Sequence, residues 1–500
     1  MVSFYKGNES GQVPGLLPYP PEGYYWWEAG AMFGALVAYW KFTGDTSYNA
    51  IITQAMLHQV GEDIDFAPRN QTTSLGNDDQ AFWAMTALAA AEYNFPNPPS
   101  PSDPSWLGLA QAVFNEQIGR WDTEFCNGGL RWQVVPQNNG YNLKNSISNG
   151  ALFNIAARLA RYTKNPFYAE WAVKVWDWMV RIELIDSEFR VYDNAEAFKF
   201  NCTQLDKNQW SYNAATMIMG ASTLYNYTGG DPVWRDRTTG LLERLTSNFF
   251  LQPSGIMREG CEEPREGSKG CNTDQKSFKA YLSRWLTVTS QMAPYTAPNI
   301  TALLRTSAKA AAKQCTGGSR GTECGIRWDL DAWDGTRGVG QSMSALETVL
   351  GTLIGVPVIS EQPPPPLTGD TGGTSISDPT AGKNSSAIPP GAIIDPATKS
   401  DRAGAWVLTV LIVLMCVGMT VFLWTEMLET KGASTVRGKA MKERGKEKDV
   451  ERVIINLHTG KRRSVSSMGG VMEKAVVREN GMGHESRGSV NVLPKVREEI

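Results

Sequence analysis

Histidine and phosphate-binding motifs are scarce in this 500-residue sequence. It contains three histidines, and His58 is the only one that precedes the long apolar run at residues 404–424. A Ser-His-Asp triad or a histidine-based zinc site is therefore not expected. The sequence has no P-loop, no EF-hand spacing and no basic stripe before the apolar run, which argues against nucleotide, calcium and nucleic-acid partners. We predict no cofactor and no metal.

A signal peptide is also missing from the sequence. Residues 1–20, MVSFYKGNESGQVPGLLPYP, contain no apolar core of the signal-peptide type. The run GAWVLTVLIVLMCVGMTVFLW at residues 404–424 is nevertheless long enough to cross a bilayer, with a tryptophan near each end. From Lys431 to Arg463 there are 11 basic and 4 acidic residues, which places the tail in the cytoplasm by the positive-inside rule. We therefore expect the large N-terminal part to be extracytoplasmic and a signal peptide to lie upstream of residue 1.

Cysteines and glycosylation sequons agree with this orientation. Six of the seven cysteines and all six N-x-S/T sequons precede the apolar run, as expected for an oxidising compartment. The shortest disulfide loops would join Cys261 to Cys271 and Cys315 to Cys324, leaving Cys126 for Cys202, although other pairings stay open. The glycosylation candidates are Asn8, Asn70, Asn201, Asn226, Asn299 and Asn384.

Composition divides the chain into four parts. We expect a folded domain over residues 1–358, followed by a Pro/Gly/Ser/Thr-rich stalk over residues 359–403 that cannot bury a core. A single transmembrane helix is predicted over residues 404–424. Residues 425–500 form a basic tail that we expect to be cytoplasmic and disordered.

Six segments of the first part repeat one pattern, in which polar or aromatic residues precede an Ala/Gly/Leu/Met-rich helix. Their starts are Trp26, Asn77, Ser146, Gln209, Thr273 and Thr336. Between them lie amphipathic segments such as YAEWAVKVWDWMVRIE, whose apolar residues fall at helical spacing. Helices that are apolar all round must be buried, and amphipathic ones cover them. We therefore predict an all-α fold, an (α/α)6 barrel or six-hairpin toroid, with the polar helix starts gathered at one end.

The stretch LGNDDQAFW places two adjacent carboxylates, Asp78 and Asp79, at one of these helix starts. Like charges in contact cannot both ionise easily, so one carboxyl retains a proton while the other stays an anion. Glycoside hydrolysis needs such a pair. The alternative is structural, because carboxylates often cap a helix or decorate its first turn. The dipeptide alone does not distinguish a retaining from an inverting reaction.

Six blocks of the sequence, in order, closely resemble glycoside hydrolase family 76, the mannan endo-1,6-α-mannosidases, and in particular their fungal cell-wall branch. The blocks are PPEGYYWWEAGAMFGALVAYWKFTGDTSYN, SLGNDDQAFW, GGLRWQ, KNSISNGALFNIAARLARYT, CNTDQKSFKAYLSRWL and WDGTRGVGQSMSALE. The resemblance implies an (α/α)6 barrel and a retaining reaction, with Asp78 as nucleophile and Asp79 as acid/base. It also implies α-1,6-mannan or the glycan of GPI-anchored proteins as substrate, and wall glucan as a possible acceptor of transferred glycan. Members of this branch commonly end in a GPI signal, whereas here about 76 residues follow the apolar run, which favours a permanent membrane span.

Substrate-binding residues are expected among the polar and aromatic side chains near the helix starts. Orienting amides and stacking rings suit a neutral polyol. The alternative role for each of these side chains is to cap a helix or to pack in the core. The candidates are Trp27, Asn77, Gln80, Trp132, Asn149, Asn213, Asp274, Gln275 and Trp333.

The sequence therefore predicts a single-pass enzyme of the cell membrane or an endomembrane that hydrolyses or transfers α-1,6-mannose chains. One alternative is a non-catalytic glycan receptor with the same fold, although a binder has no need for a repelling aspartate pair. Another is an inverting glycosidase or a polysaccharide lyase on a similar toroid. A lyase usually handles acidic sugars and would want cationic residues at the site.

Overall fold

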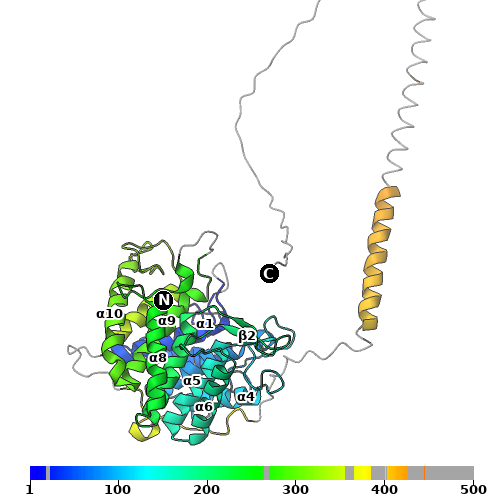
Figure 1. The fold of residues 1–500 in the computed structure, drawn as a ribbon. Coiled ribbons are helices and arrows are strands. Elements are labelled where there is room, and N and C mark those ends of the chain that lie inside the picture. The colour runs from blue at the N-terminus through cyan, green and yellow to red at the C-terminus, as the bar shows by residue number, and fades with distance from the viewer. Residues whose placement is uncertain are drawn as a thin grey trace, which may run out of the picture. The chain divides into compact units, whose positions relative to one another are not determined.

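The computed structural model describes residues 1–18, 23–263, 270–354, 365–383, 400, 402–425 and 444. The chain divides into two compact units, Met1–Asp395 and Pro396–Ile500. The described part of the first unit is mainly helical, with one small sheet (Figure 1). Almost all of the predicted tail lies outside the described residues.

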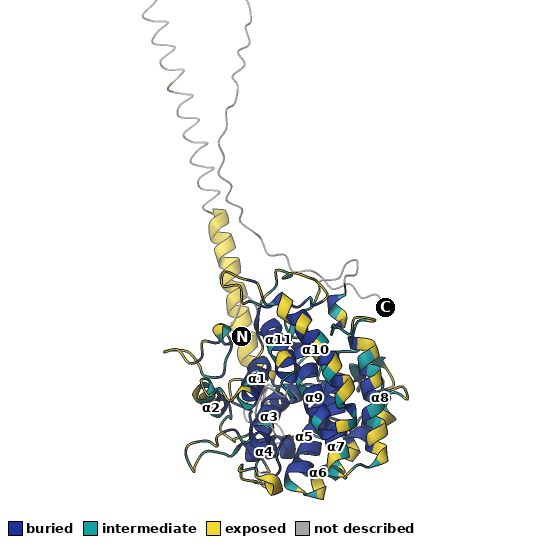
Figure 2. Ribbon diagram, turned by 90° about the vertical axis from the view of Figure 1, so that its left-hand side faces the viewer, coloured by how far each residue is buried: buried dark blue, intermediate teal, exposed yellow. Residues whose placement is uncertain are grey.

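Six helices of the first unit are buried on nearly all sides (Figure 2). Their alanine and glycine content allows close approach: a Cβ on Gly30 would lie 2.8 Å from the Trp83 ring, and one on Gly220 would lie 2.3 Å from the Phe153 ring. These inner helices are α1 (Trp26–Thr43), α3 (Asn77–Glu92), α5 (Ser146–Thr163), α7 (Ser211–Tyr227), α9 (Phe278–Met292) and α11 (Val339–Gly351).

Five helices cover the inner ones, and each lies beside the inner helix that precedes it in the chain. In the α6 helix, Val175 and Met179 are buried while Glu170 and Asp177 are exposed, as the periodicity predicts. Five of the six predicted helical hairpins are therefore present. After α11, the described residues of this unit contain no sixth covering helix. The covering helices are α2 (Asn49–His58), α4 (Trp106–Gly119), α6 (Pro166–Arg181), α8 (Pro232–Phe249) and α10 (Ala297–Gln314).

Three inner helices end on a shared local signal, a threonine followed within a few residues by a backbone turn. Thr43, Thr163 and Thr228 each donate their hydroxyl to the carbonyl four residues earlier. Gly44 and Lys164 then adopt the left-handed conformation, with φ of 72° and 58°, that ends many helices. These local bonds turn the chain from an inner helix to its covering helix.

The inner helices form a closed ring. Each contacts the next in the order α1, α3, α5, α7, α9 and α11, and α11 contacts α1. Two buried ion pairs join them inside the ring: Arg158 lies 2.6 Å from Glu92, and Arg284 lies 2.5 Å from Glu347. Buried charges of this kind are tolerated because each is paired and hydrogen-bonded. The architecture is an α/α barrel.

A small antiparallel sheet, which the sequence analysis did not predict, lies in the loops before α5 and α7. Its strands are β1 (Leu143–Asn145), β2 (Asn194–Glu196) and β3 (Leu205–Asp206). The central strand, β2, pairs with both others, and Asn145 lies opposite Asn194. The sheet therefore connects the start of α5 to the loop that follows α6.

The three expected disulfides are present. Their S–S pairs are Cys126–Cys202, Cys261–Cys271 and Cys315–Cys324, while Cys416 is free. Five of the six sequon asparagines are exposed, and Asn384 lies outside the described residues. Asn226 accepts a hydrogen bond from Arg161, and Asn201 accepts one from the backbone N–H of Cys126. Glycosylation at these positions stays a prediction.

Residues 365–383 differ from the predicted stalk because they lie against the barrel. Leu367 donates its backbone N–H to the carbonyl of Glu92 at the end of α3. The segment then follows α4, where Gln111 accepts the backbone N–H of Asp378 and Asn115 donates to the carbonyl of Ala381. We call residues 365–383 the strap. Its small residues allow the backbone to lie close to α4, and its polar groups find partners there, which composition alone does not reveal.

The described part of the second unit is essentially one helix, Arg402–Thr425. Its most apolar 18-residue window has a mean hydropathy of 2.6. The helix as a whole includes the predicted span at residues 404–424. By length and composition it is a candidate membrane-spanning helix.

Candidate active site

One cleft lies where the inner helices begin. Its lining comes from the starts of α1, α3, α7 and α9, from the end of β1, and from β2. The cleft has a volume of about 310 Å³. It is lined by Trp27, Asp78, Asp79, Phe82, Trp132, Leu143, Asn145, Asp193, Asn194, Trp210, Tyr212, Asn272, Asp274, Gln275 and Phe278. The inner helices therefore point their N-termini toward this end, as the repeat pattern predicts.

Asp78 and Asp79 lie together in the first turn of α3. Asp78 accepts the backbone N–H of Asp79 at 3.1 Å and the side-chain amide of Asn145 at 3.2 Å. Asp79 accepts the backbone N–H of Gly76 at 2.8 Å. Both carboxylates therefore fold back toward the residue that precedes the helix, where the N-terminal end of the dipole favours an anion.

The two carboxyls hold protons more tightly than ordinary aspartates. Burial and the neighbouring Asp79 raise the pKa of Asp78, and burial and Asp274 raise the pKa of Asp79 to about 7. Because like charges at this separation resist joint ionisation, the pair loses its protons in two steps. Asp78 accepts two N–H donors and Asp79 accepts one, and these bonds lower the pKa of each carboxyl against the effect of burial. In the pH interval between the two steps, one carboxylate and one carboxylic acid lie side by side.

Two further carboxylates line the same cleft. Asp274 accepts a hydrogen bond from Trp27, and its buried Oδ1 has no partner among the described residues. Burial raises the pKa of Asp274 to about 6. Asp193 accepts the side-chain amides of Asn194 and Asn213, and burial raises its pKa as well. The residues that line the cleft include four carboxylates and no lysine or arginine.

Aromatic rings form the other walls of the cleft. Tyr212 stacks on Phe278, with ring centroids 3.8 Å apart and planes 7° apart. Trp27 packs against Phe82 at 4.6 Å. Flat apolar walls beside hydrogen-bonding carboxylates suit a sugar ring, which has apolar faces and polar edges.

A second compartment opens beside the first and has a volume of about 520 Å³. The two compartments share Trp27, Asp79, Trp132 and Asp274, whereas Asp78 lines the first compartment only. The second adds neutral amides, a hydroxyl and aromatic rings from residues such as Tyr25, Trp26, Gln71, Ser74, Gln133, Asn138 and Asn139. Asp79 thus lies at the junction of two compartments that could each hold a ligand.

Four of the nine predicted substrate-binding residues line the cleft. Trp27, Trp132 and Asp274 border both compartments, and Gln275 borders the first. Their side chains are therefore placed to contact a ligand, and their role in binding stays a prediction.

The other five predicted binding residues do not line either compartment. Asn77 is buried and donates to the carbonyl of Arg131, while Gln80 is buried between Glu116 and Arg120. Asn149 bonds both backbone groups of Leu130. These amides hold the loop at residues 130–133 and the covering helix α4, and their contact with substrate stays an untested prediction.

Asn213 and Trp333 also have structural partners. Asn213 is fully buried and donates to Asp193, so it supports the cleft wall from behind. Trp333 donates its indole N–H to the carbonyl of Thr336 and packs over Gly317, away from the residues of the cleft. An aromatic residue near a helix start was not sufficient to identify a cleft residue.

Several cleft residues were missed by the sequence analysis. Asn145 and Asn194 come together only because β1 pairs with β2, and Asp193 is held at the cleft when its carbonyl accepts the N–H of Ser146. Strands of two or three residues are too short to show a period-two pattern. Asn145 had one available signal, since it immediately precedes the repeat at Ser146, where an N-cap is expected.

Among the described residues, no group of three or more His, Cys, Asp or Glu side chains is arranged to hold a metal ion. His58 lies at the end of the covering helix α2, away from the residues that line the cleft.

The sequence of this chain is similar to those of known proteins. The family model described as glycosyl hydrolase family 76 matches residues 1–362. The mannan endo-1,6-alpha-mannosidase DCW1 of Saccharomyces cerevisiae is 44% identical over 425 residues, which cover 85% of this chain and 90% of that protein. The protein of the same name from Candida albicans is 45% identical, over 85% of this chain and 91% of that one.

Two solved structures are also similar to this chain. The crystal structure of Dfg5 from Chaetomium thermophilum in complex with glucosamine is 47% identical, has a TM-score of 0.71, and covers 76% of this chain and 92% of that chain. An α-1,6-mannanase of Salegentibacter, in complex with α-1,6-mannotetrose, is 19% identical with a TM-score of 0.54, over 68% of this chain and 94% of that chain. At that identity the second likeness supports the fold alone.

Proposed function

Because the chain belongs to glycosyl hydrolase family 76, we propose that it is a retaining endo-α-1,6-mannosidase and transglycosidase that acts on α-1,6-mannose backbones in fungal cell-wall assembly. The observation that carries this proposal is the pair Asp78 and Asp79 in an aromatic cleft, two adjacent carboxyls that lose their protons in separate steps, so that over one pH interval one is an anion and the other an acid. Glycoside hydrolysis by double displacement requires these two states together.

In the first step, a carboxylate oxygen of Asp78 attacks the anomeric carbon of a mannose unit in the first compartment. The bond from that carbon to the glycosidic oxygen breaks, and Asp79 gives its proton to the leaving oxygen. The product is an ester between Asp78 and the sugar. The pKa of Asp79, raised to about 7, keeps the proton available at mildly acidic pH.

In the second step, Asp79 takes a proton from the incoming hydroxyl, whose oxygen attacks the anomeric carbon. The ester bond breaks, Asp78 leaves as the carboxylate, and the original configuration returns. Water as the incoming group gives hydrolysis, and a sugar hydroxyl gives transfer. The second compartment contacts Asp79 but not Asp78, so it is suited to the leaving or incoming group.

The neutral and acidic lining favours an uncharged glycan on both sides of the junction. The substrates we propose are α-1,6-mannan and the glycan of GPI-anchored proteins, with wall glucan as an acceptor. The Chaetomium protein named above was crystallised with glucosamine, which supports binding of a sugar by this fold.

The helix Arg402–Thr425 is proposed as a single membrane span of the cell membrane or an endomembrane. The excess of basic residues from Lys431 to Arg463 would place the tail in the cytoplasm and the barrel outside.

The test uses the full chain in a polyoxyethylene detergent, which offers no sugar acceptor, with an α-1,6-linked mannotetraose. Products and their anomeric configuration are followed by NMR for the wild type, Asp78→Asn, Asp79→Asn and the control Asp177→Asn on the exposed face of α6. We expect products of retained configuration, a loss of at least about 1,000-fold in both cleft variants and full activity in the control.

Three other outcomes would contradict the proposal in different ways. Inverted products would favour a single-displacement glycosidase, and unsaturated products a lyase. Binding that survives in every variant without turnover would favour a glycan receptor.

A further inference from the structure

We propose that Asn145 is a positioning residue for the nucleophile: its side-chain amide, fixed by the N-cap of α5, orients the carboxylate of Asp78 and favours its ionised form. This inference rests on the proposed function, because it assigns Asp78 the role of nucleophile. Asn145 lies at the end of β1 and immediately precedes α5. It is 7% exposed and lines the cleft.

Two hydrogen bonds determine which way the amide of Asn145 points. Its Oδ1 accepts the backbone N–H of Ser148 at 3.3 Å, the usual bond of an asparagine N-cap. Its Nδ2 then faces Asp78 Oδ2 at 3.2 Å. A flipped amide would present its oxygen to the carboxylate and its NH₂ to a backbone N–H, and both contacts would be repulsive. The helix cap therefore selects the donor that Asp78 meets.

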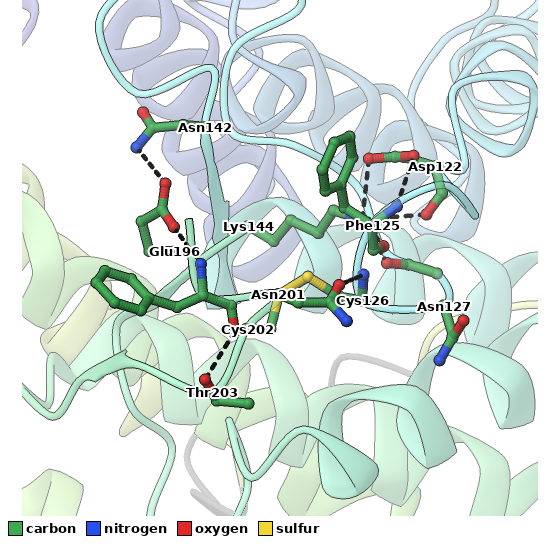
Figure 3. The surroundings of a disulfide bond; sticks show 12 residues. Asp122, Phe125, Cys126, Asn127, Asn142, Lys144, Glu196, Asn201, Cys202 and Thr203 are labelled. Carbon is green, nitrogen blue, oxygen red and sulfur yellow. Dashed lines mark hydrogen bonds and ion pairs between the residues drawn. A yellow bond between two sulfur atoms is a disulfide. The ribbon is translucent and has the colours of Figure 1, made fainter. Parts of the chain in front are cut away.

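The backbone of Asn145 is held on both sides. Its carbonyl accepts the side-chain amide of Asn149 at 2.9 Å, and its strand pairs with Asn194 of β2. The preceding residue, Lys144, is fully buried and donates to the carbonyls of Asp122 and Phe125 (Figure 3). It also donates to the carbonyl of Gly128. Because its backbone is anchored, the Asn145 side chain stays in place when the Asp78 carboxylate moves. A residue that positions another must be held rigidly in this way.

The Cys126–Cys202 disulfide lies in the same anchor. Figure 3 shows it beside the extended side chain of Lys144, and it joins the loop that Lys144 binds to the loop between β2 and β3. Asn201 accepts the backbone N–H of Cys126 in the same place. The strand that carries Asn145 is thereby fixed to its surroundings by a covalent link and several hydrogen bonds.

The donor matters because burial and the neighbouring carboxyl of Asp79 raise the pKa of Asp78. Asp79 on α3, Asp193 before β2, Asp274 before α9 and Tyr212 on α7 all line the same cleft. Lys144, next to Asn145, lies on the opposite side of the strand, where it pairs with Asp122. Among the described residues, Asn145 is the one side chain that donates a hydrogen bond to Asp78. Its donation lowers the pKa of Asp78, against burial and Asp79, which raise it.

The test compares the pH dependence of kcat/KM for the full-length wild type with that for Asn145→Ser and Asn145→Asp, on α-1,6-mannotetraose. Serine keeps an N-cap oxygen but is too short to cap the helix and reach Asp78 together. Aspartate keeps the cap and replaces the donor by an acceptor that repels Asp78. The matched control is Asn165→Ser, which changes another asparagine N-cap, that of α6, outside the cleft.

We expect the acid limb of the profile, which reports ionisation of the nucleophile, to move upward by about one pH unit in Asn145→Ser and further in Asn145→Asp. Below the optimum, kcat/KM should fall by roughly tenfold or more, since each unit of displacement is a factor of ten. The thermal midpoint should change no more than in Asn165→Ser, whose pH profile should match the wild type. If Asn145→Ser folds poorly, Asn145→Asp carries the test because it retains the cap.

An acid limb that stays at the wild-type pH in both variants, while the wild type is active, overturns the role of Asn145 and leaves the proposed function standing. A wild type without turnover overturns the proposed function first, and the role of Asn145 with it.

Discussion

Gly76 precedes the two cleft aspartates at a point where there is no room for a side chain. A Cβ there would lie 2.4 Å from Asp78 Oδ1 and 2.9 Å from Asp79 Oδ2. The backbone itself, with φ of −93° and ψ of 150°, would accept any residue. A side chain here would therefore displace the two carboxylates, whereas glycine leaves them in place.

We predict that Gly76→Ala lowers kcat by roughly 10- to 100-fold, because a displacement of the carboxylates on the order of 1 Å is costly to catalysis. The free energy of unfolding should fall by no more than about 2 kcal/mol, since the carboxylates can shift. Kinetics on α-1,6-mannotetraose and thermal unfolding measure the two effects. The control is Gly119→Ala, where a Cβ meets nothing within 4 Å. Wild-type kcat in Gly76→Ala would contradict the spatial argument.

Residues of the site could be predicted from the sequence where their role depends on near neighbours. Asp78 and Asp79 are adjacent and begin a helix, so repulsion and the helix dipole follow from the sequence itself. The amides of Asn77 and Asn149 bond backbone groups 54 and 19 residues away in the chain. An amide at a helix start looks the same whether its partner is a sugar or a distant carbonyl, so only the fold separates the two roles.

At the scale of elements, the inner helices were predictable because burial on all sides leaves a strong compositional signal. The predicted starts are correct for α1, α3 and α5, and early by two or more residues for the later helices. The segment predicted to begin at Thr273 opens with a short 3-10 turn, Gln275–Ser277, before α9. The polar residues that precede these later helices have a composition typical of a first helical turn, so the sequence does not separate the two.

The strap was not predictable, since small polar residues are as common in linkers as in segments that dock by backbone hydrogen bonds.

The strap should contribute to the stability of the barrel. It bonds Arg161 through the carbonyls of Pro366 and Leu367, and its Ser375 accepts the backbone N–H of Leu107 at the start of α4. Each such bond contributes about 1 kcal/mol net, less the entropy of ordering the segment. We predict that fragment 1–358 has a free energy of unfolding roughly 2–4 kcal/mol below that of fragment 1–383.

Urea unfolding of the two fragments, followed by tryptophan fluorescence, measures this difference. A third fragment, 1–383 with Asp378→Ala, loses the turn bonds that Asp378 makes to Thr380 and Ala381 and should lie between them. Identical midpoints for fragments 1–358 and 1–383 would show that the strap lies on the barrel without stabilising it.

At the scale of the whole molecule, the barrel concentrates buried acids that prefer to be protonated. Burial raises the pKa of Glu28 to about 8 and that of Glu259 to about 7, beside the raised values of Asp79 and Asp274. In the unfolded chain these groups ionise near pH 4. Between that pH and the raised values the folded state binds more protons than the unfolded state, so its stability must fall as pH rises.

Glu28 provides the sharpest test of this dependence. It is fully buried in the first turn of α1, its Oε2 accepts the backbone N–H of Tyr25 at 2.8 Å, and its Oε1 has no partner among the described residues. Glutamine can accept the same bond without a charge. We predict that the thermal midpoint of the wild type falls by several degrees from pH 5 to pH 8, and that Glu28→Gln makes this decline shallower.

At pH 8 the variant should be more stable than the wild type by about 1–3 kcal/mol, and at pH 5 the two should be close, because Glu28 is then protonated in the folded state. Differential scanning calorimetry across this range measures both ends. Glu170→Gln, on the exposed face of α6, is the control and should leave the curve unchanged. A wild-type midpoint that rises between pH 5 and pH 8 would mean that these acids fold as anions. The raised pKa of Asp79, on which its role as the acid depends, would then lose its physical basis, since burial is the first cause of both shifts.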